Sequence, residues 1–219
     1  MYKELACLDY NTTNADIQRA TFFALNKNFD TFCVPLLFLS SAKHYLENTK
    51  TKLAAVIDYP FGISLQEVNL YSILSSIRRG ADIIDIVINN NMIFNANWKD
   101  LKHDCQSYVA LCRERKIDIR FIIDYRLFEK ETVIELCKML KSIGIDTIIT
   151  TNGVGLDETM DNIIFSQEIQ KRIKISAIMC SSMLKNKHIS IISTFKDKPF
   201  GYRLTSYGMA ESIFGKIGV

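Results

Sequence analysis

The chain has 219 residues, 48% of them hydrophobic, and its formal net charge at pH 7 is +3. This length is enough for one large hydrophobic core, and the composition is that of an ordinary globular protein. The basic residues form only short clusters such as "RERK" and "KNKH". No stripe of interleaved aromatic residues accompanies them, so we interpret them as solvated helix faces rather than as a nucleic-acid-binding surface.

No apolar run approaches the roughly 18 residues that a membrane-spanning helix requires, and the opening "MYKELACLDY" lacks the pattern of a signal peptide. The six cysteines form no CxxC motif and do not combine with histidines at metal-ligand spacing. We therefore expect a cytoplasmic protein with buried thiols and one domain over residues 1–219, with neither nucleic acid nor membrane as a partner.

Apolar, β-branched segments alternate with amphipathic segments along the chain. The expected strands cover residues 4–10, 30–35, 52–60, 81–89, 118–124, 146–151, 173–179 and 200–206. The expected helices cover residues 13–28, 40–47, 64–80, 98–116, 133–140, 158–171 and 182–193, with a short amphipathic helix at the end. Ser64 and Glu67 form a capping box for the third of these helices, and Gly80 marks its end.

These strands are apolar on both faces, as buried parallel strands are. Eight strand–helix units in about 220 residues predict a closed (β/α)8 TIM barrel. An open doubly wound sheet is the alternative, and it is disfavoured because the chain contains neither GxGxxG nor GxxxxGK.

In a TIM barrel, functional residues lie at the carboxyl ends of the strands. Charged residues within the expected strands include Asp85, Arg120, Asp124 and Lys174. Burial of a charge is costly unless the charge is paired, so such a set indicates either a functional site or an ion network. We expect these four side chains to point into the barrel and to form one network near its carboxyl-terminal mouth.

Six segments and their order along the chain indicate a relationship to a known family: "IDYPFGISLQEV", "GADIIDIVIN", "FIID", "GIDTIITTNG", "IKISA" and "GYRLTSYGMAESIFGKIG". Together with "LDYNTTNADI" near the start, they resemble the deoxyribose-phosphate aldolase family of class I aldolases over nearly the whole chain. The resemblance implies a TIM barrel that cleaves and forms a carbon–carbon bond through a lysine Schiff base.

The resemblance also implies roles for individual residues. Asp85 matches the proton-transferring aspartate of strand four, and Lys174 matches the lysine of strand seven. Arg120 and Asp124 stand where strand five of the family carries lysine and glutamate. The Schiff-base lysine of strand six falls on Ile149, so the expected nucleophile is absent.

The groups that hold the sugar phosphate in the family are also replaced. The resemblance places the glycine pair after strand seven on Ala177 and Ile178, and the serine pair of the last helix on Tyr207 and Gly208. We therefore expect deoxyribose 5-phosphate to bind weakly or not at all. Candidate ligand-binding residues at the strand ends are Asp9, Thr151, Asn152, Gly153, Ser176 and Ser206.

Two functions remain open at this point. The first is a degenerate family member that binds another small molecule, such as an aldehyde or a sugar-like compound, or acts as a scaffold. The second is an active lyase of altered mechanism, with Lys174 as the Schiff-base amine and Asp85 as the proton carrier. Metal chemistry at Asp9, Asp85 and Asp124 is weaker, because no histidine lies at a strand end. No cofactor is expected, and the resemblance implies a homodimer.

Overall fold

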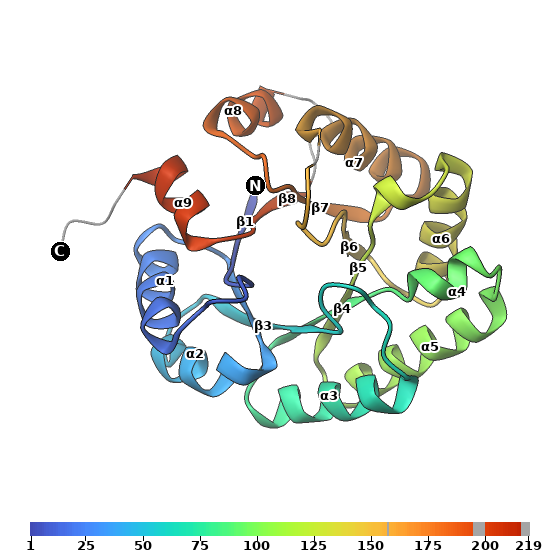
Figure 1. Ribbon diagram of the computed structural model, residues 1–219, viewed down its shortest axis with the longest axis horizontal. Helices are drawn as coiled ribbons and strands as arrows, with labels where there is room; N and C mark the ends of the chain where they lie inside the picture. Colours follow the sequence, from blue (N-terminus) through green and yellow to red (C-terminus); the bar gives the residue numbers. More distant parts are fainter. Residues whose placement is uncertain (157, 195–199, 216–219) are drawn as a thin grey trace.

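The computed structural model describes residues 1–156, 158–194 and 200–215, and these form a closed parallel barrel surrounded by helices (Figure 1). Each strand pairs with the next, and β8 pairs with β1 to close the sheet. The strands are β1 (Tyr2–Ala6), β2 (Thr31–Pro35), β3 (Lys52–Ile57), β4 (Ile83–Val87), β5 (Asp118–Ile122), β6 (Thr147–Ile149), β7 (Ser176–Cys180) and β8 (Gly201–Leu204). The predicted (β/α)8 TIM barrel is confirmed.

The helices follow the strands in chain order and form the outer layer (Figure 1). They are α1 (Asn14–Asn26), η1 (Leu36–Phe38), α2 (Leu39–Leu46), α3 (Gln66–Arg78), α4 (Asn90–Phe94), α5 (Trp98–Glu114), η2 (Tyr125–Leu127), α6 (Lys130–Ser142), α7 (Thr159–Ile173), α8 (Asn186–Thr194) and α9 (Tyr207–Phe214). Within the described residues, no helix combines the length and the apolar character needed to cross a membrane.

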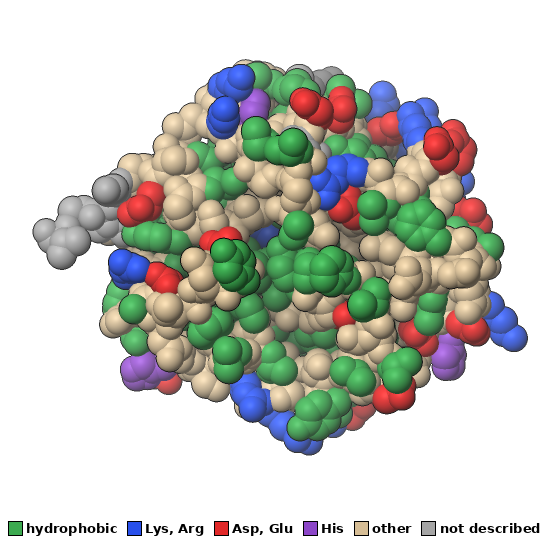
Figure 2. All heavy atoms as spheres, viewed as in Figure 1, with side chains coloured by type: hydrophobic (Ala, Val, Ile, Leu, Met, Phe, Trp, Pro, Cys, Tyr) green, Lys and Arg blue, Asp and Glu red, His purple; other side chains and the backbone are tan. Residues whose placement is uncertain are grey.

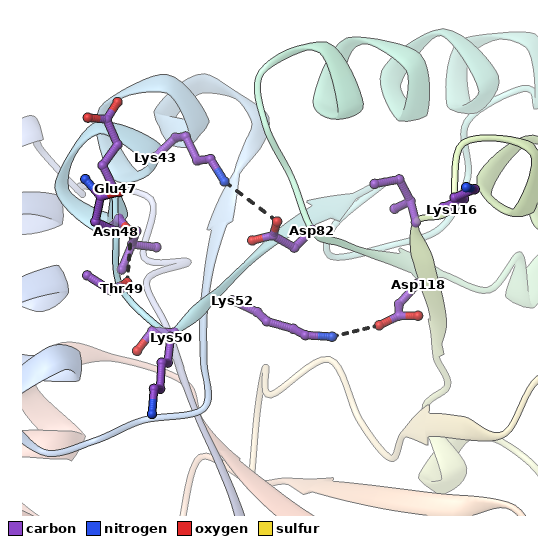
Figure 3. A pocket seen from close by; sticks show the side chains of 12 residues that line it. Lys43, Glu47, Asn48, Thr49, Lys50, Lys52, Asp82, Lys116 and Asp118 are labelled. Atoms are coloured by element: carbon purple, nitrogen blue, oxygen red, sulfur yellow. Dashed lines mark hydrogen bonds and ion pairs between the residues drawn. The ribbon is translucent and has the colours of Figure 1, made fainter.

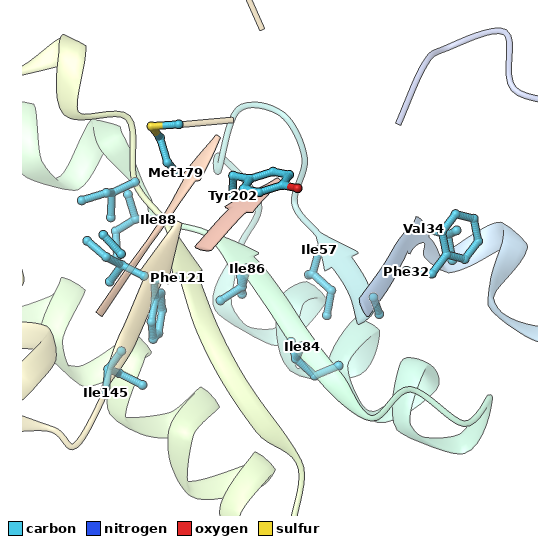
Figure 4. Packing of buried hydrophobic residues seen from close by; sticks show 14 of the residues in the cluster. Phe32, Val34, Ile57, Ile84, Ile86, Ile88, Phe121, Ile145, Met179 and Tyr202 are labelled. Atoms are coloured by element: carbon cyan, nitrogen blue, oxygen red, sulfur yellow. The ribbon is translucent and has the colours of Figure 1, made fainter. Parts of the chain in front are cut away.

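Alternation along the strands separates two apolar layers, because successive residues of a strand face opposite sides of the sheet. On β4, Ile84 and Ile86 belong to the large core between strands and helices, which Figure 4 shows in part. Their neighbours Ile83 and Val87 belong to a smaller cluster inside the barrel. The interior is therefore a packed core rather than a channel.

The interior cluster fills the barrel with small and β-branched side chains. Its buried members are Ala6, Cys33, Ala54, Val56, Ile83, Val87, Ile122, Ile149, Ile178 and Cys180. Leu8 and Tyr59, which follow β1 and β3, pack against this cluster from the carboxyl-terminal end. Tyr2, at the start of β1, packs against it from the opposite end.

The prediction of where β7 begins was wrong. Helix α7 continues to Ile173, and Lys174 is its C-terminal cap with a left-handed backbone (φ 60°). Strand β7 therefore begins at Ser176 instead of residue 173. The predicted capping box of α3 is also wrong, because Leu65 occupies the N-cap position and the Ser64 hydroxyl instead donates to Asp58 Oδ1 over 2.7 Å.

The six cysteines are free and buried, as the sequence predicted. Burial raises the pKa of the thiols of Cys7, Cys112 and Cys137 to about 12. These thiols therefore stay protonated at neutral pH and behave as small apolar side chains.

Candidate functional site

The carboxyl-terminal mouth of the barrel contains a cavity of about 450 Å³. Its walls come from the segments that follow β1, β3, β6 and β8, and the lining residues are Leu8, Asp9, Tyr10, Tyr59, Pro60, Gly153, Val154 and Thr205. Figure 2 views the molecule from this face and shows hydrophobic side chains gathered around its centre. In a parallel barrel this end is the position of the functional site.

The floor beneath this mouth is hydrocarbon. Ile149 on β6 pairs with Ile178 on β7, and both side chains are completely buried. Both belong to the interior cluster with Ile122 and Val87. At the position where the family resemblance implies a Schiff-base lysine, the barrel is therefore filled by packed isoleucines.

Lys174 does not lie beside Ile149, which corrects the prediction from the sequence. It caps the carboxyl end of α7, two residues before β7 begins, and its side chain is exposed. This position is at the amino-terminal end of the barrel, across the barrel from the mouth. The neighbour of Ile149 on β7 is Ile178. Ser176, a predicted ligand-binding residue, is the first residue of β7 and lies at the same distant end.

A buried network of four charges lies inside the barrel, and two of its members were predicted. Arg120 donates to Asp85 through Nε (2.7 Å to Oδ1) and Nη2 (2.9 Å to Oδ2), and its Nη1 lies 3.0 Å from Glu4 Oε2. Arg203 contacts the carboxylates of both Glu4 and Asp85. The two arginines balance the two acids, so the network has no formal net charge.

The network stabilises the ionised form of Asp85. Burial alone would raise the pKa of this carboxyl, but the charges of Arg120 and Arg203 and their hydrogen bonds outweigh burial and lower the pKa below its usual value. The nearby acids Asp85 and Glu4 likewise outweigh burial and raise the pKa of the Arg120 guanidinium. Asp85 and the two arginines are therefore charged at neutral pH, and Asp85 is held as an ion-pair partner.

The location of this network differs from the prediction. Arg120 lines a separate cavity of about 390 Å³ together with Tyr2, Thr147 and Phe200, which lie where their strands begin. Arg120 also donates to the Tyr2 hydroxyl over 3.2 Å. Arg120 thus extends the network toward the amino-terminal end. Arg203 is in register with Cys180, two residues beyond Ile178, and lies nearer the mouth, so the network spans the barrel interior instead of forming only at the mouth. Asp124 and Lys174 take no part in it.

Asp124 has a different partner at the end of β5. Its carboxylate accepts from Arg126 Nε at 2.7 Å and from Arg126 Nη2 at 2.6 Å. Arg126 also donates to the backbone oxygens of Val154 at 3.0 Å and Leu156 at 2.8 Å. This pair joins the segment after β5 to the segment after β6, which gives Asp124 a structural role.

The polar residues after β6 mainly build a turn. The Thr151 hydroxyl donates to Cys180 O over 2.8 Å and accepts from Gly153 N over 3.0 Å. Asn152 donates to Pro60 O over 3.1 Å and accepts from Val154 N over 2.9 Å. Gly153 has a φ of +77°, and a Cβ atom there would collide with Thr205 Cγ2. The turn therefore carries Gly153 into the cavity wall and places Thr205 beside it.

The remaining predicted site residues lie at the carboxyl-terminal face. Asp9 lines the cavity. Ser206 is the N-cap of α9, where its hydroxyl accepts from Met209 N over 3.2 Å. Of the predicted residues, the structure thus brings only Asp9 and Gly153 to the cavity lining.

A metal ion does not fit the strongest ligand cluster that the described residues offer. Glu4, Cys33 and Asp85 place one ligand atom each within 4.8 Å of one another. The guanidinium groups of Arg120 and Arg203 already contact both carboxylates. A divalent cation among these atoms would meet two fixed positive charges.

A second surface hollow, of about 570 Å³, lies at the amino-terminal end of the barrel (Figure 3). It is larger than the mouth cavity and carries several lysines. Lys43 lies 3.7 Å from Asp82, and Lys52 lies 3.1 Å from Asp118, so two of the lysines are paired across exposed surface. We place the candidate site at the mouth because parallel barrels carry function at their carboxyl-terminal end.

Two members of the ion network and six of the eight residues that line the mouth were not among the predicted site residues. Glu4 and Arg203 have the network role, and Tyr59 and Thr205 line the mouth. Glu4 could have been found from strand alternation, because it stands two positions before the interior residue Ala6. Tyr59 follows β3 and Thr205 follows β8. Whether two such loops line one cavity depends on the tertiary fold, which a local sequence pattern does not predict.

A closed parallel barrel with its open cavity at the carboxyl-terminal end defines the TIM-barrel class, and comparisons with known proteins narrow it. No model of a known family matches the chain. The chain is 28% identical over 158 residues to a deoxyribose-phosphate aldolase of Histophilus somni, covering 72% of this chain and 70% of the relative. It is 27% identical over 173 residues to that of Caldicellulosiruptor saccharolyticus, covering 78% and 79%.

Solved structures agree on the fold. A deoxyribose-phosphate aldolase from Aeropyrum pernix, described as tetrameric, superposes with a TM-score of 0.81 at 16% identity, over 95% of this chain and 87% of that one. An aldolase named QR15 superposes with a TM-score of 0.80 at 18% identity, over 97% and 92%. The chain is thus similar in sequence to deoxyribose-phosphate aldolases, and the solved structures share its TIM-barrel fold.

Proposed function

We propose that this protein is a deoxyribose-phosphate aldolase-like barrel that does not perform Schiff-base aldol chemistry and that binds a different small molecule in its carboxyl-terminal mouth. The observation that carries the proposal is the pair Ile149 and Ile178, which fills the floor of the mouth on β6 and β7. A Schiff base needs an unprotonated amine within reach of a carbonyl carbon, and this floor offers hydrocarbon only.

The distribution of lysines supports the same proposal. Among the described residues, no lysine is buried, and the buried cations are arginines. Arginine keeps its proton throughout the physiological range and cannot form a Schiff base. The alternative lyase based on Lys174 loses its support, because that amine lies on the surface at the end of the barrel opposite the mouth.

Two residues expected in a phosphate-binding loop lie elsewhere in the barrel. Ala177 and Ile178 lie within β7, so they do not occupy the loop after it, which begins at Ser181. The cavity itself gives a more direct reason. Its one charged lining residue among those the structure describes is Asp9, and a carboxylate repels a phosphate ester. We therefore expect the mouth to disfavour deoxyribose 5-phosphate.

A retro-aldol assay tests this function. The purified protein is incubated with deoxyribose 5-phosphate, and acetaldehyde is measured by coupled reduction to ethanol. We expect no release above a protein-free blank, while the aldolase of Histophilus somni, assayed in parallel, shows that the assay works. Acetaldehyde release that scales with the amount of this protein would contradict the proposal.

A further inference from the structure

The mouth cavity is lined by three polar side-chain groups that have no hydrogen-bond partner within the described part of the protein, and Asp9 among them is exposed to solvent. Within the described part of the chain, neither the Asp9 carboxylate nor the hydroxyls of Tyr59 and Thr205 form a side-chain hydrogen bond or an ion pair, yet all three residues line one cavity. Asp9 uses only its backbone oxygen, which accepts from the amide and the hydroxyl of Thr12 at 3.1 and 2.7 Å. The cavity thus offers one carboxylate and two hydroxyls to a ligand.

Other acids that follow strands on this face are already occupied, which sets Asp9 apart. Asp58, after β3, accepts from Ser64 N at 3.0 Å and from Asn69 Nδ2 at 3.1 Å. Asp124, after β5, is paired with Arg126. Those two carboxylates hold their own loops in place. Asp9 has no such structural role.

The charges around Asp9 leave the cavity electronegative. The lining contains no lysine, arginine or histidine, and all of its residues lie in the described part of the chain. Burial raises the pKa of Asp9, and the negative charge of Asp16 on α1 adds to this effect. Burial raises the pKa of Tyr59 and the buried cation Arg203 acts on that residue in the opposite sense, but Glu4 and Asp85 balance the charges of Arg203 and Arg120 within the network.

The rest of the lining is apolar or aromatic. Leu8, Pro60 and Val154 form hydrocarbon walls, and Tyr59 adds an aromatic ring, whereas Tyr10 is fully exposed at the rim. The face of a tyrosine ring attracts a positive charge placed within about 6 Å of the ring centre. Acidic, aromatic and hydroxyl groups in one small cavity form a site that suits cations and repels anions.

Resting on the proposed function, which makes the mouth a small-molecule site, we propose that its ligand is a small organic cation: a primary amine attached to an apolar body. The ammonium group has three N–H donors. One pairs with the Asp9 carboxylate, and the others reach the hydroxyl oxygens of Thr205 and Tyr59. The apolar body lies against the hydrocarbon walls and the ring of Tyr59. A sugar phosphate, which the relatives' name indicates as their substrate, carries the opposite charge.

A series of probes with one body and three charges tests the ligand class. The probes are 2-phenylethylamine, 2-phenylethanol and 3-phenylpropionate, titrated into the protein at neutral pH and low salt by calorimetry. A charge-assisted contact in a partly open cavity predicts that the amine binds about tenfold more tightly than the alcohol. The carboxylate should bind most weakly of the three. High salt should weaken binding of the amine but not of the alcohol.

Variants then assign the effect to Asp9. Asp9→Asn keeps the shape of the side chain and removes its charge, so the amine and the alcohol should bind within about twofold of each other. Asp100→Asn, an exposed acid in the first turn of α5, removes the same charge far from the cavity and should keep the full preference. If Asp9→Asn fails to fold, Thr205→Val provides a second test. We expect it to weaken binding of the amine several-fold.

The outcomes separate the two proposals. Equal binding of amine and alcohol by the wild type, a preference that survives Asp9→Asn, tighter binding of the carboxylate, or no binding of any probe would each overturn the ligand class proposed here. None of these results would bear on the proposal that the protein performs no aldol chemistry. Only acetaldehyde release from deoxyribose 5-phosphate, or a trapped Schiff base, would contradict that proposal.

Discussion

At the scale of single residues, the barrel interior pairs Arg120 and Arg203 with the buried carboxylates of Glu4 and Asp85. Removing four charges from water is costly, so such a network adds little net stability compared with a well-packed apolar core. Loss of one member lowers the stability of the folded protein strongly, because it leaves an uncompensated buried charge. The network therefore makes the barrel sensitive to substitutions at these positions.

Replacement of Arg203 by methionine should destabilise the protein strongly. Arg203 is 1% exposed and contacts both acids, so Arg203→Met leaves two carboxylates against one guanidinium. We expect a loss of about 3–5 kcal/mol in the free energy of unfolding, measured by urea denaturation. Lys52→Met is the matched control, because Lys52 pairs with Asp118 on exposed surface and should cost at most about 1 kcal/mol. Similar losses for both variants would contradict the role of the network.

The same network predicts how stability depends on pH. The pKa of Asp85 in the folded protein lies below its value of 3.8 in the unfolded chain, so protons bind the unfolded chain more readily. The stabilisation is therefore complete well above pH 4 and is lost as the pH falls through about 4 and below. In urea denaturation between neutral and acidic pH, the stability difference between wild type and Asp85→Asn should shrink across this window. A constant difference would show that Asp85 is not held ionised by the arginines.

At the scale of elements, the sequence predicts types and order well and boundaries less well. The two predicted members of the network, Asp85 and Arg120, were found because they are charges inside β-branched segments. Lys174 was misplaced because α7 extends to Ile173 and ends on a left-handed lysine. A glycine at that position would have signalled the end of the helix. Since strand residues alternate sides, an error of a few residues changes which side chains reach the interior.

Helix α9 allows a test of whether Ser206 serves the helix or the ligand. Its hydroxyl accepts from Met209 N, as an N-cap does. Ser206→Ala should lower the free energy of unfolding by about 1 kcal/mol and leave binding of 2-phenylethylamine unchanged. Thermal or urea unfolding and calorimetry on the same sample measure both effects. Unchanged stability with weakened binding would instead place Ser206 in the binding site.

At the scale of the whole molecule, the alternation of apolar and amphipathic segments was sufficient to predict the TIM barrel. Buried parallel strands have a distinct composition, and eight of them joined by helices have few other arrangements. The mouth cavity could not be predicted in the same way. Its lining comes from separate loops, and Tyr59 and Thr205 meet there only because the barrel closes between β8 and β1. Oligomeric state and the predicted homodimer stay predictions.

We propose that, among the residues the structure describes, the mouth of this barrel has no amine able to form a Schiff base. Treatment of the native protein with acetaldehyde and borohydride, followed by intact mass and peptide mapping, tests it directly. We expect no site-specific adduct on the wild type. An Ile149→Lys variant supplies the comparison, because burial at that position lowers the pKa of a lysine and favours its neutral form.

The variant should lose a few kcal/mol of stability, since a cation replaces a packed isoleucine. If circular dichroism shows it folded, the adduct should map to position 149 alone. We expect that result together with an unlabelled wild type. A stoichiometric adduct on one lysine of the native wild-type protein would contradict it.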